Sequence, residues 1–187
     1  SLVHAYNSLG LTYVELNQYA EAISIYLLGL RLDPQNDAML FNLGNANLKL
    51  GLIEDSIDCY RKAIAANPKD AIYYKNLGMV FEQQGVIDLA VVEFEKAINA
   101  QPDLVDSYLL LAASLKVLNQ RDKAIDTCKA YLNLKFDKPE DHCADTSKIY
   151  NMLGIICQDM AKMNEALENY QTSVEFDPEN AGAHSNL

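Results

Sequence analysis

The side chains best suited to chemistry are few and widely separated in this sequence. The histidines are His4, His142 and His184, and the cysteines are Cys59, Cys128, Cys143 and Cys157. Catalysis needs a nucleophile, a base and a stabilising group that converge on one point, and nothing in this distribution brings them together. The sequence also lacks a Gly-rich phosphate loop and a zinc-spaced Cys/His set. We therefore expect no enzyme activity and no cofactor.

One short segment does group residue types that bind metals. Asp141, His142, Cys143 and Asp145 lie almost side by side. Such neighbouring residues lack the spacing that lets two side chains chelate one ion, so we expect no metal site. The cysteines form no C-x-x-C pair, and a chain of this size needs no disulfides for stability. Free thiols in a reducing, cytoplasmic compartment are favoured over disulfides in a secreted protein.

The composition limits the kinds of partner. Half of the 187 residues are apolar, enough for a folded core, and the net charge is −11. Nucleic acids and anionic membrane surfaces attract clustered Lys and Arg, so an acidic chain argues against both. No uninterrupted apolar run of about 18 residues is present for membrane insertion. Other proteins or peptides remain as the expected partners.

The strongest signal is an internal repeat. A helix-internal Leu-Gly pair recurs with a spacing of 34 residues and is followed by a small residue, a large residue and a proline. The pairs are Leu9-Gly10, Leu43-Gly44, Leu77-Gly78, Leu111-Ala112 and, after a longer gap, Leu153-Gly154. The small residues are Ala22, Ser56, Ala90, Ala124 and Ala166; the large ones are Tyr26, Tyr60, Phe94, Cys128 and Tyr170; the prolines are Pro34, Pro68, Pro102 and Pro178.

This order of residues resembles the tetratricopeptide repeat, W-x2-L-G-x2-Y…A-x3-F…P. The first aromatic is matched by Tyr6, Tyr74, Tyr108 and Tyr150, and the second by Tyr13 and Phe81. The resemblance implies an all-α fold, a right-handed α-solenoid of helix–turn–helix repeats with the first helices on its concave side. It also implies a protein-binding module that is not an enzyme.

We expect one array over residues 1–187, with units at 3–36, 37–70, 71–104, 105–138 plus an insertion to 146, 147–180, and a partial sixth at 181–187. Helices are predicted at 3–15, 19–32, 37–49, 53–66, 71–83, 87–100, 105–118, 121–134, 147–160 and 163–176. The sixth unit stops after half a helix, so we expect the sequence to be a piece of a longer protein. The same truncation predicts that Leu167, Tyr170 and Val174 are partly uncovered, and that the ends self-associate unless the half-helix suffices.

Each repeated position has a physical reason. Glycine inside a helix costs about 1 kcal/mol relative to alanine, so we expect close approach of the partner helix to compensate for it. The large residues four positions after the small ones are predicted to fill the space between neighbouring hairpins. Unit four departs from the pattern at Ala112, Cys128, Tyr131 and Phe136, and the insertion lies within residues 135–146. Pro139 favours a backward extension of the next helix, and the insertion is either a partner-specific protrusion or a neutral loop.

The family resemblance implies that the concave face of the first helices binds the partner. The candidate contact residues are Asn7, Leu11, Phe41, Asn42, Asn45, Lys75, Asn76, Met79, Leu110, Asn151 and Met152. Its charged positions balance, with four acids (Glu15, Glu82, Asp106 and Asp159) and four bases (Lys49, Lys75, Lys116 and Lys148). Recognition is therefore expected to depend on amides and apolar pockets.

Two binding modes of the family can be compared with these positions. The Lys/Asn/Asn/Lys/Arg clamp of co-chaperones finds its cations in no register of this sequence. An asparagine ladder like that of O-linked N-acetylglucosamine transferase is half matched, by Asn42, Asn76 and Asn186 out of six positions. Those amides are either peptide-backbone ligands or ordinary exposed polar residues. Two functions stay open: a peptide-binding adaptor, or an assembly scaffold that uses the repeat ends and the convex face.

Overall fold

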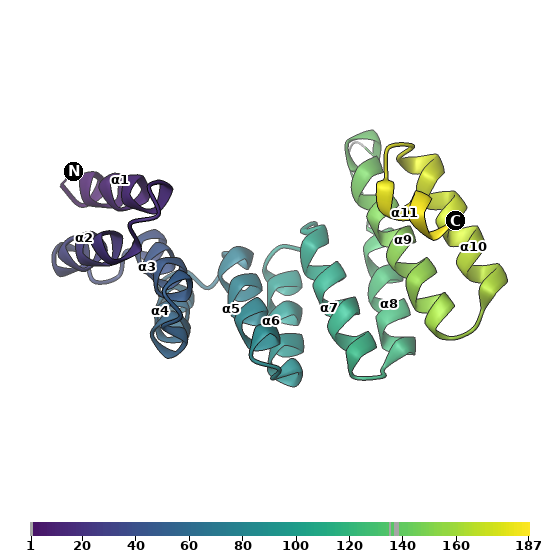
Figure 1. Ribbon diagram of the computed structural model, residues 1–187, viewed down its shortest axis with the longest axis horizontal. Coiled ribbons are helices and arrows are strands. Elements are labelled where there is room, and N and C mark those ends of the chain that lie inside the picture. Colours follow the sequence, from purple (N-terminus) through teal and green to yellow (C-terminus); the bar gives the residue numbers. More distant parts are fainter. Residues whose placement is uncertain (1, 135, 137–138) are drawn as a thin grey trace. The chain divides into compact units, whose positions relative to one another are not determined.

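The computed structural model describes residues 2–134, 136 and 139–187, and every regular element in these ranges is helical (Figure 1). The helices form two compact units, residues 1–84 and 85–187. The ten full helices predicted from the repeat are all present among the described residues, together with the half-helix of a sixth unit. Lys135, Asp137 and Lys138 of the predicted insertion lie outside them.

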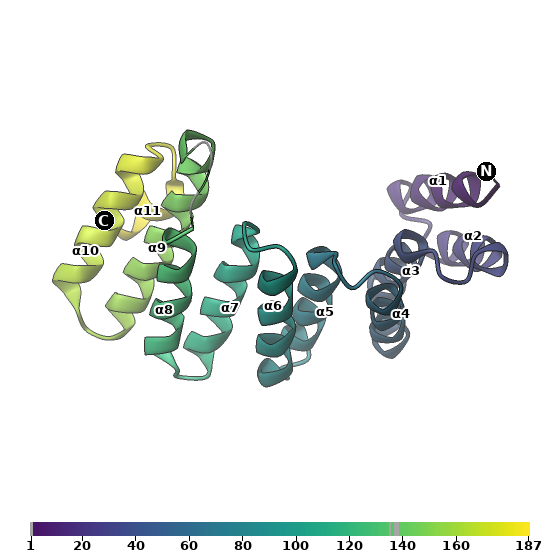
Figure 2. The ribbon, with the colours of Figure 1, turned by 180° about the vertical axis from the view of Figure 1, so that it is seen from behind.

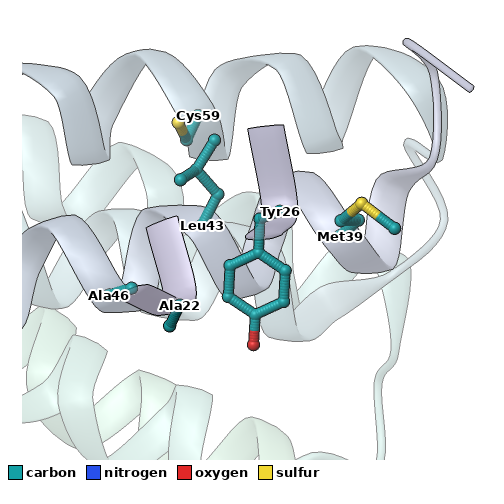
Figure 3. Close-up of a cluster of buried hydrophobic side chains, with 6 residues drawn as sticks. All are labelled: Ala22, Tyr26, Met39, Leu43, Ala46 and Cys59. Atoms are coloured by element: carbon teal, nitrogen blue, oxygen red, sulfur yellow. The ribbon is translucent and has the colours of Figure 1, made fainter. Parts of the chain in front are cut away.

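The N-terminal unit contains five helices. They are α1 (Leu2–Glu15), α2 (Tyr19–Leu32), α3 (Asp37–Lys49), α4 (Ile53–Ala66) and α5 (Ala71–Gln83). Each helix packs on the next, and α1 also touches α3. The core of the first two hairpins contains Ala22 and Tyr26 from α2 and Met39, Leu43 and Ala46 from α3, next to Cys59 of α4 (Figure 3).

The C-terminal unit contains α6 (Ile87–Ala100), α7 (Val105–Val117), α8 (Arg121–Leu132), the 3-10 helix η1 (Pro139–His142), α9 (Cys143–Asp159), α10 (Met163–Phe176) and α11 (Ala181–Asn186). Consecutive α-helices again pack on each other, and α7 touches α9. Figures 1 and 2 show α7, α8, α9 and α10 standing in chain order, with α11 against α10.

The two largest departures from the predicted bounds flank the insertion. Helix α8 ends at Leu132, two residues early, and Asn133 caps it with its backbone N–H directed to the carbonyls of Lys129 and Tyr131. Helix α9 begins at Cys143, four residues earlier than the repeat register predicts. The turn of 3-10 helix that starts at Pro139 leads directly into it, so the predicted backward extension is confirmed.

The recurring glycine accommodates an aromatic ring, which corrects the expectation that it admits a neighbouring backbone. A Cβ atom added at Gly44 would lie 2.8 Å from Cε1 of Tyr60, the large residue of the same hairpin. The overlap would be worse between Gly10 and Tyr26 and between Gly154 and Tyr170. The aromatic rings therefore fill a notch within their own hairpin as well as the space towards the next one.

This contact also explains two departures of unit four. Ala112 replaces the glycine, and Cys128 replaces the aromatic ring that would occupy the notch. Both side chains are fully buried on the paired helices α7 and α8. A methyl group is tolerated at 112 because the smaller thiol at 128 leaves space for it, so the two changes compensate each other.

The turn inside each hairpin has the same backbone geometry. Asn17, Gly51, Gly85, Asn119 and Ala161 occupy equivalent positions, and all five have positive φ, between 58° and 76°. In the turn after α9, Ala161 has the left-handed conformation, and the next residue, Lys162, caps the C-terminus of the helix. Its backbone N–H donates a 3.0 Å hydrogen bond to the carbonyl of Cys157. Glycine and asparagine suit this conformation, whereas alanine at 161 is strained.

Candidate functional site

The candidate residues of the N-terminal unit lie on α1, α3 and α5. The side chains of α1 and α3 are joined directly, because Nδ2 of Asn42 donates a 3.0 Å hydrogen bond to Oδ1 of Asn7. Both amides are half-buried. This bond uses one of the two N–H groups of Asn42, so the amide keeps donor and acceptor capacity for a further partner.

Asn45 and Phe41 belong partly to the core. Oδ1 of Asn45 accepts a 2.6 Å hydrogen bond from the hydroxyl of Tyr60, whose pKa is raised by burial. The ring of Phe41 lies 5.7 Å from that of Tyr60 and 5.1 Å from that of Tyr73, measured between centroids. Phe41 is half-buried, so it offers one edge to a partner while it anchors α3 between α4 and α5.

The remaining candidate residues of this unit differ in their exposure and in the hydrogen bonds that their side chains make. Nδ2 of Asn76 donates 2.8 Å to the carbonyl of Ile72 one turn back on the same helix, which leaves its oxygen to accept. Leu11 and Met79 are exposed apolar side chains, and Lys75 is half-buried. This surface therefore presents both amide and apolar groups. We call the set Asn7, Leu11, Phe41, Asn42, Asn45, Lys75, Asn76 and Met79 the first-helix surface.

A pocket of about 370 Å³ lies between α1, where Asn7 lines it, and the start of α3. Its other lining residues include Asp33 and Asp37, two acids that the sequence-based set did not contain. Burial raises the pKa of Asp37, but hydrogen bonds from Asn67 at 2.9 Å and Tyr73 at 3.0 Å, together with backbone N–H groups, outweigh it and lower the pKa. The pocket therefore carries the ionised carboxylate of Asp37 next to the amide pair.

Leu110, Asn151 and Met152 lie in the C-terminal unit, on α7 and α9, and all three are half-buried. Oδ1 of Asn151 accepts a 3.0 Å bond from Nδ2 of Asn186 on α11. This pair repeats the geometry of Asn7 and Asn42. Two of the balanced charges also meet here, since Lys116 and Asp159 form an ion pair of 3.3 Å.

Reactive and metal-binding groups contribute little to these surfaces. All four cysteines are free, and Cys59, Cys128 and Cys157 are buried. Burial raises the pKa of Cys128 to about 12, so its thiol stays protonated. Within the described ranges, no group of three or more His, Cys, Asp or Glu side chains is placed to hold a metal ion. No described helix is long and apolar enough to span a bilayer.

Paired helices, ring-filled glycine notches and amide contacts between successive first helices define an all-helical repeat protein. Models of the tetratricopeptide repeat match residues 10–51, 38–70, 71–104 and 147–180. The chain belongs to the tetratricopeptide repeat family, and this membership supports a general role in protein–protein interaction.

Solved structures have the same fold. The crystal structure of MamA is 22% identical, with a TM-score of 0.75 over 92% of this chain and 96% of that one. YrrB, described as having an unusual peptide-binding site, is 17% identical, with a TM-score of 0.70 over 96% and 89%. TTC0263, a TPR protein of Thermus thermophilus, is 22% identical, with a TM-score of 0.62 over 98% and 95%. No curated protein sequence matches this chain significantly.

Proposed function

We propose that this protein binds an extended segment of a partner protein on its first-helix surface. The observation that carries the proposal is the pair Asn7 and Asn42, which presents side-chain amides on the same set of first helices as exposed Leu11 and Met79. Amides offer both a donor and an acceptor to a peptide main chain, and the apolar side chains offer contacts to its side groups. Leu110, Asn151 and Met152 are proposed to serve the same role in the C-terminal unit.

The likeness to YrrB is consistent with this role, because that protein is described as having a peptide-binding site. The two carboxylates beside Asn7 indicate which residue type the partner segment carries at this point. A segment that lies over Asn7 is expected to place a basic or hydrogen-bond-donating residue near Asp33 and Asp37. The sequence predicts a binding surface without net charge, and this prediction fits least well around Asn7.

The test begins with a peptide selected from a displayed library against the complete chain. Asn42→Ala combined with Asn76→Ala should weaken its binding by about 1–3 kcal/mol, the usual range for lost amide contacts. The matched control is Arg61→Ala on α4, an exposed residue outside the first-helix surface. Unchanged affinity in the double variant, or an equal loss in the control, would rule out the proposed surface.

The second candidate function is an assembly scaffold. Exposed side chains on α1 favour it. Leu9 is 43% exposed, whereas its equivalents Leu43, Leu77, Leu111 and Leu153 are at most 5% exposed. Ala5 and Thr12 are exposed beside it, although their equivalents Met39 and Ala46 are buried. An apolar strip that the other repeats cover is therefore open on α1, and two copies could associate through it.

At the other end, the prediction of partly uncovered residues holds for Leu167, which is 45% exposed, and for half-buried Val174. It is wrong for Tyr170, which is buried because its ring fills the notch at Gly154. Sedimentation tests the scaffold: Leu9→Lys should dissociate an oligomer, and Leu52→Lys, an equally exposed position in a turn, should not. A wild-type chain that stays monomeric at high concentration would exclude this candidate.

A further inference from the structure

The insertion between units four and five borders a pocket that the peptide-binding proposal does not use. It has a volume of about 440 Å³ and lies in the C-terminal unit. Four aromatic side chains line it, Tyr131 from α8, Phe136 from the insertion, Tyr150 from α9 and Phe176 from α10, with two leucines and a threonine. The rings of Tyr150 and Phe176 are nearly parallel, with centroids 5.6 Å apart, and those of Tyr131 and Phe136 are also 5.6 Å apart.

One polar group in this lining has no partner. Tyr131 is fully buried, and its hydroxyl makes no hydrogen bond in the structure. A buried hydroxyl without a partner is unfavourable, and a ligand that supplies a hydrogen bond removes that cost. The residue is also specific to this repeat, because alanine occupies the equivalent positions 63 and 97.

The charges around the pocket are predominantly acidic. Asp145 precedes the lining residue Thr146, and Asp177 follows the lining residue Phe176. Burial is the main cause that raises the pKa of Tyr131 to about 12, and the charges of Asp145 and Asp103 raise it further. The carboxylates of Asp145 and Asp103 therefore both act on its hydroxyl. Two described bases lie near the lining: His142, whose ring stacks on that of Phe136 with centroids 3.7 Å apart, and Lys148, which is paired with Asp145 at 2.8 Å.

We propose that this aromatic pocket binds an arginine side chain of a partner protein. Aromatic faces attract a cation, and a guanidinium group also stacks on them and donates several hydrogen bonds in one plane. Its aliphatic stem would pack on Tyr150 and Phe176. Its donors would meet the carboxylate of Asp145 beside Lys148 and, after a small rotation of the Tyr131 ring, the hydroxyl oxygen of Tyr131. An apolar side chain would fill the same volume but would leave the Tyr131 hydroxyl without a partner.

The proposal concerns the C-terminal unit alone and is independent of the first-helix surface. Its probe is acetyl-Gly-Arg-Gly-amide, titrated into the complete chain while backbone amide signals are followed by NMR. Signals of residues around Tyr131, Tyr150 and Phe176 should shift. The neutral isostere acetyl-Gly-citrulline-Gly-amide should bind about tenfold or more weakly, because the cation–π attraction is lost. Equal binding of the citrulline peptide, tighter binding of acetyl-Gly-Leu-Gly-amide, or no shift at the pocket would overturn the proposal.

Two variants test the two parts of the site. Phe176→Leu keeps an apolar surface without an aromatic face, and Asp145→Asn removes the charge without changing the size of the side chain. Each should weaken the arginine peptide about fivefold or more, in line with lost cation–π and charge contacts. Glu168→Gln on α10 is the control for loss of one exposed negative charge away from the pocket. If the control weakens binding as much as Asp145→Asn, attraction to the acidic chain as a whole explains the binding and the proposal is wrong.

Discussion

Nδ2 of Asn42 on α3 donates a hydrogen bond of 3.0 Å to Oδ1 of Asn7 on α1, across a sequence separation of 35 residues. Asn186 and Asn151 make the same bond with the same distance and separation. The repeat is 34 residues long in units one to four, so a separation of 35 residues means that the two asparagines do not occupy equivalent positions. The donor lies one position further along its repeat than the acceptor does along the preceding repeat. The bond couples successive first helices on the face proposed to bind peptide.

A double-mutant cycle of Asn7→Ala and Asn42→Ala should reveal this coupling. Each single substitution is expected to lower the free energy of unfolding by about 0.5–1.5 kcal/mol, because it leaves the other amide without its partner. The double variant should lose less than the sum of the two. Urea unfolding followed by circular dichroism measures all four proteins, and strictly additive effects would mean that the hydrogen bond contributes nothing to stability.

Tyr26 presents the opposite situation, a buried hydroxyl without a partner. Its equivalents Tyr60 and Tyr170 donate to Asn45 at 2.6 Å and to Gln158 at 2.8 Å. The positions equivalent to those two acceptors in unit one are Leu11 and Val14, which cannot accept a hydrogen bond. Burial accordingly raises the pKa of Tyr26 to about 12 and leaves its hydroxyl unpaired.

Tyr26→Phe should therefore leave the melting temperature unchanged or raise it, because it removes an unsatisfied polar group at almost constant volume. Tyr60→Phe is the matched comparison and should destabilise by about 0.5–1.5 kcal/mol, since it breaks the bond to Asn45. Calorimetry of the two variants decides the point. A clear loss of stability in Tyr26→Phe would show that its hydroxyl has a partner after all.

The helix positions could be predicted from the sequence because glycine and proline fix the phase of the repeat. Every helix except α8 and α9 begins and ends within one residue of its predicted bounds. Those two flank the insertion, where the repeat period no longer determines how many residues join the connection and how many join the helix. The period also shows that glycine recurs, but it does not identify the Tyr60 ring as the group that fills the notch at Gly44.

The candidate site was less predictable, for two physical reasons. Side-chain rotamers are invisible in a sequence, so the bond from Asn76 to its own helix could not be distinguished from an amide that faces a ligand. The pocket beside Asn7 is formed by α1 together with the connection to α3. Asp33 and Asp37 lie outside the first-helix positions that the family resemblance carries over, although their closeness to Pro34 places them at this junction.

The notch contact predicts a compensated exchange between repeats. Gly154→Ala alone should destabilise the protein by about 1–3 kcal/mol, because its Cβ would overlap the ring of Tyr170. Tyr170→Cys alone should also be destabilising, since it empties the notch. The double variant reproduces the natural pair Ala112 and Cys128, so its loss should be smaller than the sum by about 1 kcal/mol or more.

Thermal unfolding of the four proteins in this cycle measures the coupling. The hydroxyl bond from Tyr170 to Gln158 is lost in both proteins that carry Tyr170→Cys, so it cancels from the coupling. The reverse exchange in unit four is the control: Ala112→Gly should partly rescue Cys128→Tyr. Additive losses in both hairpins would mean that the glycine is not there to accommodate the ring.

Ala161 carries the last prediction, because it is the one residue other than glycine or asparagine among the five equivalent left-handed turn positions. An L-residue with a Cβ pays about 1–2 kcal/mol for this conformation, and glycine does not. Part of the gain from Ala161→Gly is offset by the greater freedom of glycine in the unfolded chain. The net effect should be a stabilisation of about 0.5–1 kcal/mol, seen as a higher urea midpoint with an unchanged slope.

The matched control is Gly51→Ala, the reverse change at the equivalent turn of unit two. Gly51 has φ of 76°, and a Cβ added there would meet no atom within 4 Å, so any loss of stability comes from the backbone alone. The two substitutions should therefore shift stability in opposite directions by similar amounts. If Ala161→Gly lowers the midpoint, the turn after α9 is held by contacts of the alanine methyl group, and the left-handed geometry is not the source of strain.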